Sequence, residues 1–145
     1  MEGMVAWCDR HLHELDPATT SVICLDTVGS PRLIMLEGEG PVVMEDYYDR
    51  SFRDLVATVA DRAGASLRRG MRSRNSTDAV IPSRAGFPTA TLASMDRYKA
   101  LSNYHLMTDT PENLDYTTVV QALVVADELA RELARNPWIG CPSLR

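Results

Sequence analysis

Several features that mark specialised classes of protein are scarce or missing in this chain of 145 residues. Its three cysteines, Cys8, Cys24 and Cys141, are an odd number at unrelated spacings, which indicates neither a disulfide framework nor a zinc knuckle. No apolar run approaches the roughly 18 residues of a membrane span. Acidic residues outnumber basic ones, and the net charge of −5 argues against a nucleic-acid partner. What remains is a chain with room for one domain and a single core.

The first turns of the chain do not have the composition of a signal peptide, because acidic residues are mixed into residues 1–16. A leader or a membrane segment upstream of these residues would not be visible in them, so the sequence leaves the compartment open. Cys8 and Cys24 lie among apolar neighbours and are expected to be buried thiols. The basic cluster of residues 67–74 is expected to be a solvated turn beside a strand.

Helical and strand patterns alternate along the chain without internal repeats. Apolar side chains at helical spacing and capping residues predict helices near residues 4–15, 48–63, 77–86 and 119–133. Runs of β-branched and apolar residues predict strands near residues 19–29, 31–40, 66–72 and 87–94. This alternation predicts an α/β fold, a three-layer sandwich in which helices flank a mostly parallel central sheet.

Residue types that can carry chemistry follow the predicted strands, where loops meet over a sheet. Asp26 ends a buried strand, and by itself it could cap the next turn or bind a metal ion. Asp78 could cap the short helix that follows it. His105 stands between Tyr104 and Asp109 in a polar stretch that also has an ordinary interpretation as the start of the last helix.

Other candidate ligands have simpler interpretations. His11 and His13 in the stretch "HLHE" point about 200° apart on a helix, which predicts a core position for His11 and a solvent-facing one for His13. Glu37 and Glu39 in "LEGEGP" could provide carboxylates on a turn, but a solvated hairpin is the favoured interpretation. These residues are therefore not expected to complete a metal site.

Three stretches in order resemble motifs of one enzyme family. They are "LDTVGS", "TDAVIPSRAGFPTATL" and "NYHLMTDTPENLDYTTV". They are similar to the successive C-terminal motifs of the co-catalytic di-zinc aminopeptidases, metallopeptidase family twenty-eight, and the resemblance runs from about Gly3 to the end of the last helix. It implies a zinc exopeptidase fold of which residues 1–145 form the C-terminal part.

The resemblance also implies roles for particular residues. Asp26 matches the carboxylate that binds one zinc ion, and His105 matches the histidine that binds the other. Tyr104 matches a tyrosine that stabilises the tetrahedral intermediate in some members. Asp78 matches the aspartate of a "Ser-Asp-His" motif whose serine and histidine are replaced here by Thr77 and Ala79. Asp109 matches an aspartate of the loop that follows the histidine ligand, where it would support a ligand without binding metal itself. A supporting role is therefore expected for both aspartates.

The complete family site holds two zinc ions and hydrolyses a peptide bond near a free N-terminus. Its remaining ligands and its glutamate general base belong to a segment upstream of the one that this chain resembles, so the chain alone is expected to be inactive. A non-catalytic interaction module, as in the related transferrin receptor, is the alternative. A half-domain leaves an apolar strand edge or helix face uncovered, so we expect a second copy or a complementing N-terminal half as partner.

Overall fold

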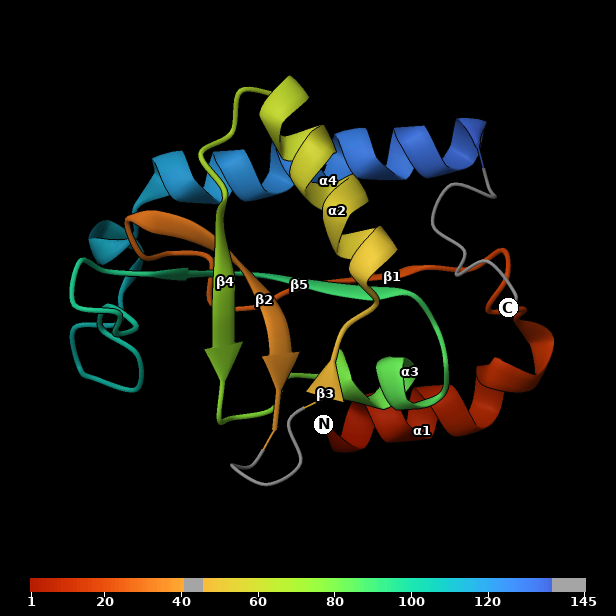
Figure 1. Ribbon diagram of the computed structural model, residues 1–145. Helices are drawn as coiled ribbons and strands as arrows, with labels where there is room; N and C mark the ends of the chain where they lie inside the picture. Colours follow the sequence, from red (N-terminus) through yellow and green to blue (C-terminus); the bar gives the residue numbers. More distant parts are fainter. Residues whose placement is uncertain (41–45, 137–145) are drawn as a thin grey trace.

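The computed structural model describes residues 1–40 and 46–136 as a β-sheet with helices on both faces (Figure 1). The strands are β1 (Val22–Leu25), β2 (Arg32–Glu39), β3 (Asp46–Tyr47), β4 (Arg68–Ser73) and β5 (Thr89–Met95). The helices are α1 (Glu2–His11), α2 (Arg50–Arg62), α3 (Val80–Arg84) and α4 (Tyr116–Arg135), with 3-10 turns η1 (Leu12–Glu14) and η2 (Pro111–Asn113). The α/β class and the helix-flanked sheet are confirmed. Cys141 lies outside the described residues.

The sheet is mixed in strand direction. β1 and β5 pair in parallel, and so do β2 and β4, whereas β2 is antiparallel to both β5 and β3. The expectation of a mostly parallel sheet therefore holds for β1–β5 and β2–β4 alone. Parallel neighbours need a long crossover connection, and the short loop of residues 26–31 between β1 and β2 sends the chain back in the opposite direction instead.

Each face of the sheet has its own apolar core. On one face α2 and α4 pack over the strands, and on the other lie α1 and α3 (Figure 1). The first core is built around Leu33, Met35, Phe52, Val56, Leu92, Val125 and Leu129. The second is built around Ile34, Leu36, Tyr48, Ala79, Ala93 and Met95. Because successive residues of a strand point to opposite faces, the run Leu33–Leu36 supplies both cores.

The two long helices on the first face begin at aspartate caps. The carboxylate of Asp49 accepts a hydrogen bond from the backbone N–H of Phe52 at 2.8 Å, and that of Asp115 accepts one from Thr118 N–H at 3.0 Å. Such caps satisfy backbone donors that the first helical turn leaves without partners. In residues 1–40 and 46–136 none of the helices has both the length and the apolar composition of a membrane span.

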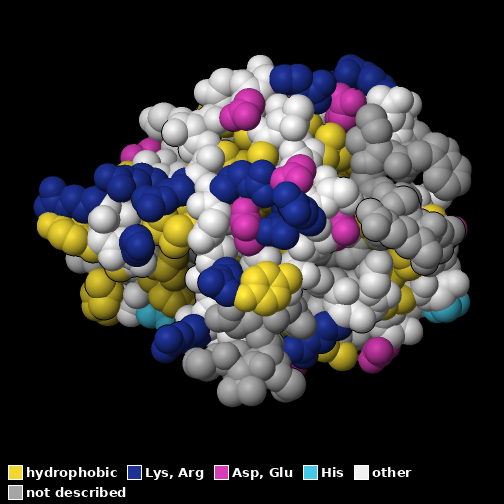
Figure 2. Space-filling view, in the orientation of Figure 1, with side chains coloured by type: hydrophobic (Ala, Val, Ile, Leu, Met, Phe, Trp, Pro, Cys, Tyr) yellow, Lys and Arg dark blue, Asp and Glu magenta, His cyan; other side chains and the backbone are white. Residues whose placement is uncertain are grey.

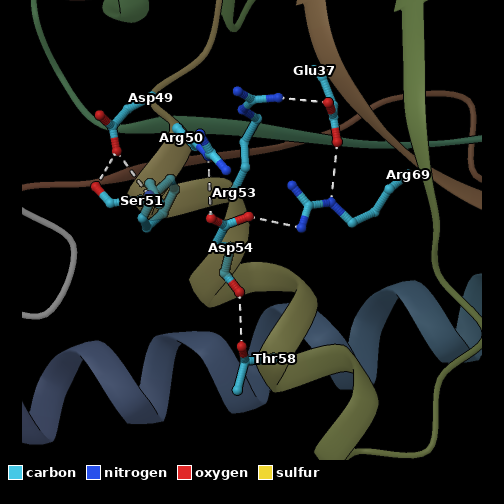
Figure 3. Close-up of polar contacts among 9 residues, drawn as sticks. Glu37, Asp49, Arg50, Ser51, Arg53, Asp54, Thr58 and Arg69 are labelled. Carbon is cyan, nitrogen blue, oxygen red and sulfur yellow. Dashed lines mark hydrogen bonds and ion pairs between the residues drawn. The ribbon is translucent and has the colours of Figure 1, made fainter.

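A network of ion pairs ties β4 to β2 and α2 (Figure 3). Nη1 of Arg53 lies 2.6 Å from Oε2 of Glu37, and Nε of Arg69 lies 3.1 Å from Oε1 of the same glutamate. Nη1 of Arg69 also lies 2.7 Å from Oδ1 of Asp54. Partial burial opposes the charged form of Glu37, but the Gly70 backbone N–H and the two guanidinium groups outweigh it and lower its pKa. Charged side chains of both signs gather near the middle of this face (Figure 2).

Three expectations about exposure need correction. Glu37 does not lie on a solvated hairpin, because residues 32–39 form one continuous strand in the interior of the sheet. His11 was expected in the core but is only half-buried, because other parts of the chain cover α1 incompletely. Cys8 is the one fully buried residue of this helix. Cys24 is half-buried as well, whereas Cys8 is buried and His13 is exposed, as predicted.

Candidate functional site

The loop after β1 carries the first candidate ligand, Asp26. Its backbone N–H donates to Leu92 O at 3.0 Å, so the residue is fixed at the carboxyl end of the strand. Burial raises the pKa of its carboxyl group, and the nearby carboxylates of Glu39 and Asp78 raise it further. Among the described residues, no hydrogen bond to the carboxylate contributes to this shift, which burial and the two negative charges account for. A half-buried carboxylate beside two others is an environment that a divalent cation would stabilise.

Three serines hold the loop after β1 to the rest of the site. The hydroxyl of Ser94, on β5, donates to the carbonyl of Thr27 and accepts from the backbone N–H of Ser30 at 2.7 Å. The hydroxyl of Ser30 in turn accepts from the N–H of Ser102 at 2.9 Å. Ser94 is fully buried, so these bonds are shielded from water. The serines therefore connect the loop of Asp26 to the loop of Tyr104 and His105.

The second loop presents its aromatic rings as a stacked pair. The ring centroids of Tyr104 and His105 are 3.9 Å apart, with 17° between the planes. Tyr104 and Asp26 line the same cavity, which has a volume of about 290 Å³ and a floor that includes Ile34 and Met95. His105 is exposed beside this cavity and does not line it.

The surroundings of the second loop are unusually apolar for an exposed segment. Hydrophobic side chains and positive charges gather at the end of the molecule where this loop lies (Figures 1 and 2). The exposed side chains include Tyr98, Leu101, Tyr104, Leu106 and Met107. Asp109 is exposed on the following turn, where its N–H donates to Leu106 O at 3.0 Å, and its predicted supporting role stays a prediction.

Backbone strain is concentrated in these loops. Among the described residues other than glycine, positive φ angles occur at Thr27 (50°), Lys99 (65°), Asn103 (60°) and His105 (57°). Each of them lies in one of the two loops, and for a β-branched residue such as Thr27 the conformation is costly. Residues held in sparsely populated backbone conformations cluster at functional sites, where the surrounding structure enforces them. The strain therefore supports this end of the sheet as the site.

Glu39 is a participant that the sequence did not reveal. It is fully buried, and Oε1 accepts hydrogen bonds from the hydroxyls of Tyr48 at 2.6 Å and Thr77 at 2.9 Å. Oε2 accepts from the backbone N–H of Thr77 at 2.5 Å. The prediction of a solvated hairpin is wrong for Glu39, because β2 runs on to this residue and its donors come from distant parts of the chain. No local pattern could have indicated a pairing with residues 48 and 77.

The buried carboxylate of Glu39 affects the pKa values of the side chains around it. Burial raises the pKa of Tyr48 far above its ordinary value, and the hydrogen bond to Glu39 adds to this. Burial also raises the pKa of Cys24 to about 11, and the charges of Asp26, Glu39 and Asp78 act in the same direction. Asp78 itself is half-exposed just before α3. It contributes charge near Asp26, and whether it supports a metal ligand stays a prediction.

The site residues fit zinc in type but not in number. Carboxylate oxygen and imidazole nitrogen are both ordinary zinc ligands. However, no group of three or more His, Cys, Asp or Glu side chains in residues 1–40 and 46–136 is arranged to hold a metal ion. Asp26 and His105 could therefore each contribute one ligand to a site that needs others.

In the metal-free chain, Asp26→Asn is expected to increase stability near pH 7 but not near pH 3. Because the pKa of Asp26 is raised on folding, the folded chain holds this proton more tightly than the unfolded chain. The protonated Asp26 carboxyl group makes its full contribution to stability below the pKa of about 3.9 that it has in the unfolded chain. This contribution is lost as pH rises through the higher pKa of the folded chain.

We expect Asp26→Asn to raise the free energy of unfolding near pH 7 by less than about 1 kcal/mol, since solvent screens a half-exposed carboxylate. Thermal unfolding of both proteins in a chelator at the two pH values measures it. Equal stability near pH 7 would contradict the raised pKa.

Comparison with known proteins is consistent with this geometry. The model of peptidase family M28 matches residues 5–130. Two solved structures of BSAP, a zinc aminopeptidase from Bacillus subtilis, superpose with a TM-score of 0.66 each, at 21% and 22% sequence identity. The alignments cover 90% of this chain and 32% of BSAP, so the chain spans about a third of that enzyme's length. A search of curated proteins gave no match.

At this identity the two structures show the fold alone, which is that of a zinc peptidase. The family model identifies the family as well as the fold, because it matches most of the chain, residues 5–130. This range includes the loops of Asp26, Tyr104 and His105. The predicted family is thereby confirmed, and the chain belongs to peptidase family M28.

Proposed function

We propose that this chain forms part of the site of a zinc-dependent aminopeptidase that hydrolyses peptide bonds near a free N-terminus. Asp26 would bind one zinc ion and His105 the other. The observation that carries the proposal is that Asp26 and Tyr104 line one cavity, with the His105 ring stacked on Tyr104 at 3.9 Å. Zinc bound here would supply a Lewis acid that polarises the substrate carbonyl and lowers the pKa of water.

Tyr104 would act on the substrate through its hydroxyl. It lines the cavity beside Asp26, where it can donate a hydrogen bond to the oxygen on which negative charge develops during attack on the carbonyl. The Ser94–Ser30–Ser102 hydrogen bonds hold the two loops together, so they position Tyr104 relative to Asp26. The peptide substrate would lie across these loops.

The described residues supply one expected ligand for each ion, which is fewer than the roughly three protein ligands of a catalytic zinc. We therefore propose that other residues, contributed by a complementing polypeptide segment, complete the site and provide the general base. The chain by itself is expected to bind zinc weakly and to hydrolyse no peptide substrate.

Zinc binding by three single variants tests the proposal. Asp26→Asn and His105→Gln should each weaken zinc binding by about tenfold or more, because each removes a ligand. His13→Gln is the matched control, since this exposed histidine lies in the turn η1, outside both loops. Isothermal titration with zinc measures the affinities. If both site variants bound zinc as tightly as the His13→Gln control, the assignment of Asp26 and His105 would be wrong.

A non-catalytic interaction module is the second candidate function. It is favoured by the same observation that no set of three potential ligands is assembled in residues 1–40 and 46–136. Under this alternative the unmodified chain would bind no zinc in the titration, and a complementing segment would not restore binding.

A further inference from the structure

A buried hydrogen-bond network adjoins the candidate site and takes no part in the chemistry proposed for it. At its centre is the fully buried carboxylate of Glu39, which accepts hydrogen bonds from the hydroxyl of Tyr48 and from the hydroxyl and backbone N–H of Thr77. Burial of a charge costs free energy even when donors surround it, and an apolar side chain would fill the same space without that cost. The buried charge is explained if its contacts hold something that the site needs.

The contacts of Glu39 fix the turn that carries Asp78. Thr77 directly precedes Asp78, and both its backbone N–H and its hydroxyl donate to the Glu39 carboxylate. The same hydroxyl accepts a hydrogen bond from the backbone N–H of Ala79 at 3.3 Å, and Ala79 is fully buried in the second core. Asp78 therefore stands between two anchored residues, although its own side chain is half-exposed.

This turn forms part of the wall of the cavity. Thr77 lines the cavity together with Asp26 and Tyr104. Burial raises the pKa of the Asp26 carboxyl group, and Asp78 lies near enough for its charge, like that of Glu39, to raise it further. A negative charge beside a ligand also favours the binding of a divalent cation, and this effect weakens as the distance grows. The place of the Asp78 carboxylate therefore affects any cation that Asp26 binds.

We propose that Glu39 and Thr77 are positioning residues of the site, which hold the Asp78 carboxylate in place beside Asp26. Neither of the two would bind the cation or the substrate. Glu39 holds Thr77 from the interior of the fold and Thr77 holds the turn at the cavity wall, so the turn is fixed before any ligand binds. The consequence for metal binding rests on the proposed zinc site, whereas the hold on the turn does not.

Two hydroxyl groups offer a matched pair of variants, because both donate to Oε1 of Glu39. The hydroxyl of Tyr48 also accepts from the hydroxyl of Thr91 at 3.3 Å, and that of Thr77 also accepts from the N–H of Ala79. Tyr48→Phe and Thr77→Val therefore each remove one donor and one acceptor, and urea unfolding should show similar losses of stability. Of the two residues only Thr77 lines the cavity. A purely structural role of the network predicts the same behaviour of both variants at the site.

Hydrogen exchange in the zinc-free chain tests whether Thr77 holds the turn. The amides of Val80 and Ile81 donate to the carbonyls of Thr77 and Asp78 at 3.4 Å each, so they report on the turn without being bonds that the variants remove. Relative to the amides of β5, they should exchange at least about tenfold faster in Thr77→Val than in Tyr48→Phe, because the turn loses its anchor. Thr77→Ser keeps the hydroxyl and should exchange as slowly as the unmodified chain. Equal exchange in Thr77→Val and Tyr48→Phe would overturn the proposal.

Zinc titration of the same variants tests the consequence for the site. Thr77→Val should bind zinc at least about threefold more weakly than Tyr48→Phe, and it should have no further effect in an Asp78→Asn background, because it acts through that carboxylate. Equal zinc affinities of Thr77→Val and Tyr48→Phe, or a full effect of Thr77→Val without the Asp78 charge, would refute the positioning role. An unmodified chain that binds no zinc would contradict the proposed zinc site alone, since the exchange measurements still decide whether Glu39 and Thr77 hold Asp78.

Discussion

Replacing Glu39 with alanine is expected to lower the free energy of unfolding by about 3–5 kcal/mol. The carboxylate is fully buried and accepts three hydrogen bonds, one from Tyr48 and two from Thr77. Alanine leaves these donors without an acceptor in a place that water does not reach, and it also leaves a cavity. Urea unfolding monitored by circular dichroism measures the loss.

Two further variants make this test specific. Glu39→Gln keeps the size of the side chain and one acceptor oxygen but turns an amide N–H₂ toward the remaining donors, so it should lose about half as much stability. Glu128→Ala removes an exposed carboxylate of α4 and should change stability by no more than about 0.5 kcal/mol. If Glu39→Ala cost no more than Glu128→Ala, Glu39 would not be the buried acceptor that the structure shows.

The second large effect is expected at Ser94. Ser94→Ala should cost about 2–3 kcal/mol, because it removes the donor to the Thr27 carbonyl and the acceptor of the Ser30 N–H. Since Asp26 directly precedes Thr27, the variant should also weaken zinc binding, although Ser94 is not an expected ligand. Urea unfolding and zinc titration of the same protein samples measure the two effects.

Ser66→Ala is the matched control for Ser94→Ala. Ser66 is exposed, and its hydroxyl takes no part in the hydrogen bonds that join the site loops. Its replacement should leave both stability and zinc affinity unchanged within about 0.5 kcal/mol. If Ser94→Ala behaved like this control in both measurements, the serine connection between the loops would have no energetic importance.

Elements that depend on neighbouring residues were well predicted. The stripe of apolar residues 48–63 and Gly64 predict α2, although the helix begins at Arg50 and not at Tyr48, and the run "FPTATLAS" predicts β5, which begins two residues later at Thr89. The direction of β2 was not predicted, because it depends on the insertion of β5 between β1 and β2. Alternating strand and helix patterns carry no information about which strands become neighbours.

The residues of the candidate site were likewise predicted only in part. Asp26, Tyr104 and His105 were identified from ordered motifs, and the structure brings the first two to one cavity. The burial of Glu39 could not be predicted, because its partners stand at positions 48 and 77 and only the folded sheet brings them together. Serine is equally common on exposed turns, so the sequence alone gave no reason to select Ser94 among the others.

The serine hydrogen bonds also determine when the site can form during folding. They join residues that are 64, 67 and 72 positions apart in the sequence. Contacts of such long range form slowly, because the chain must close large loops before any of the bonds can be made. Neither of the two loops can therefore take up its geometry from local sequence, and both are assembled together once β5 lies between β1 and β2. During synthesis, a chain that has not yet emerged beyond Ser102 has no organised site, so the zinc binding that we propose should arise in one late step.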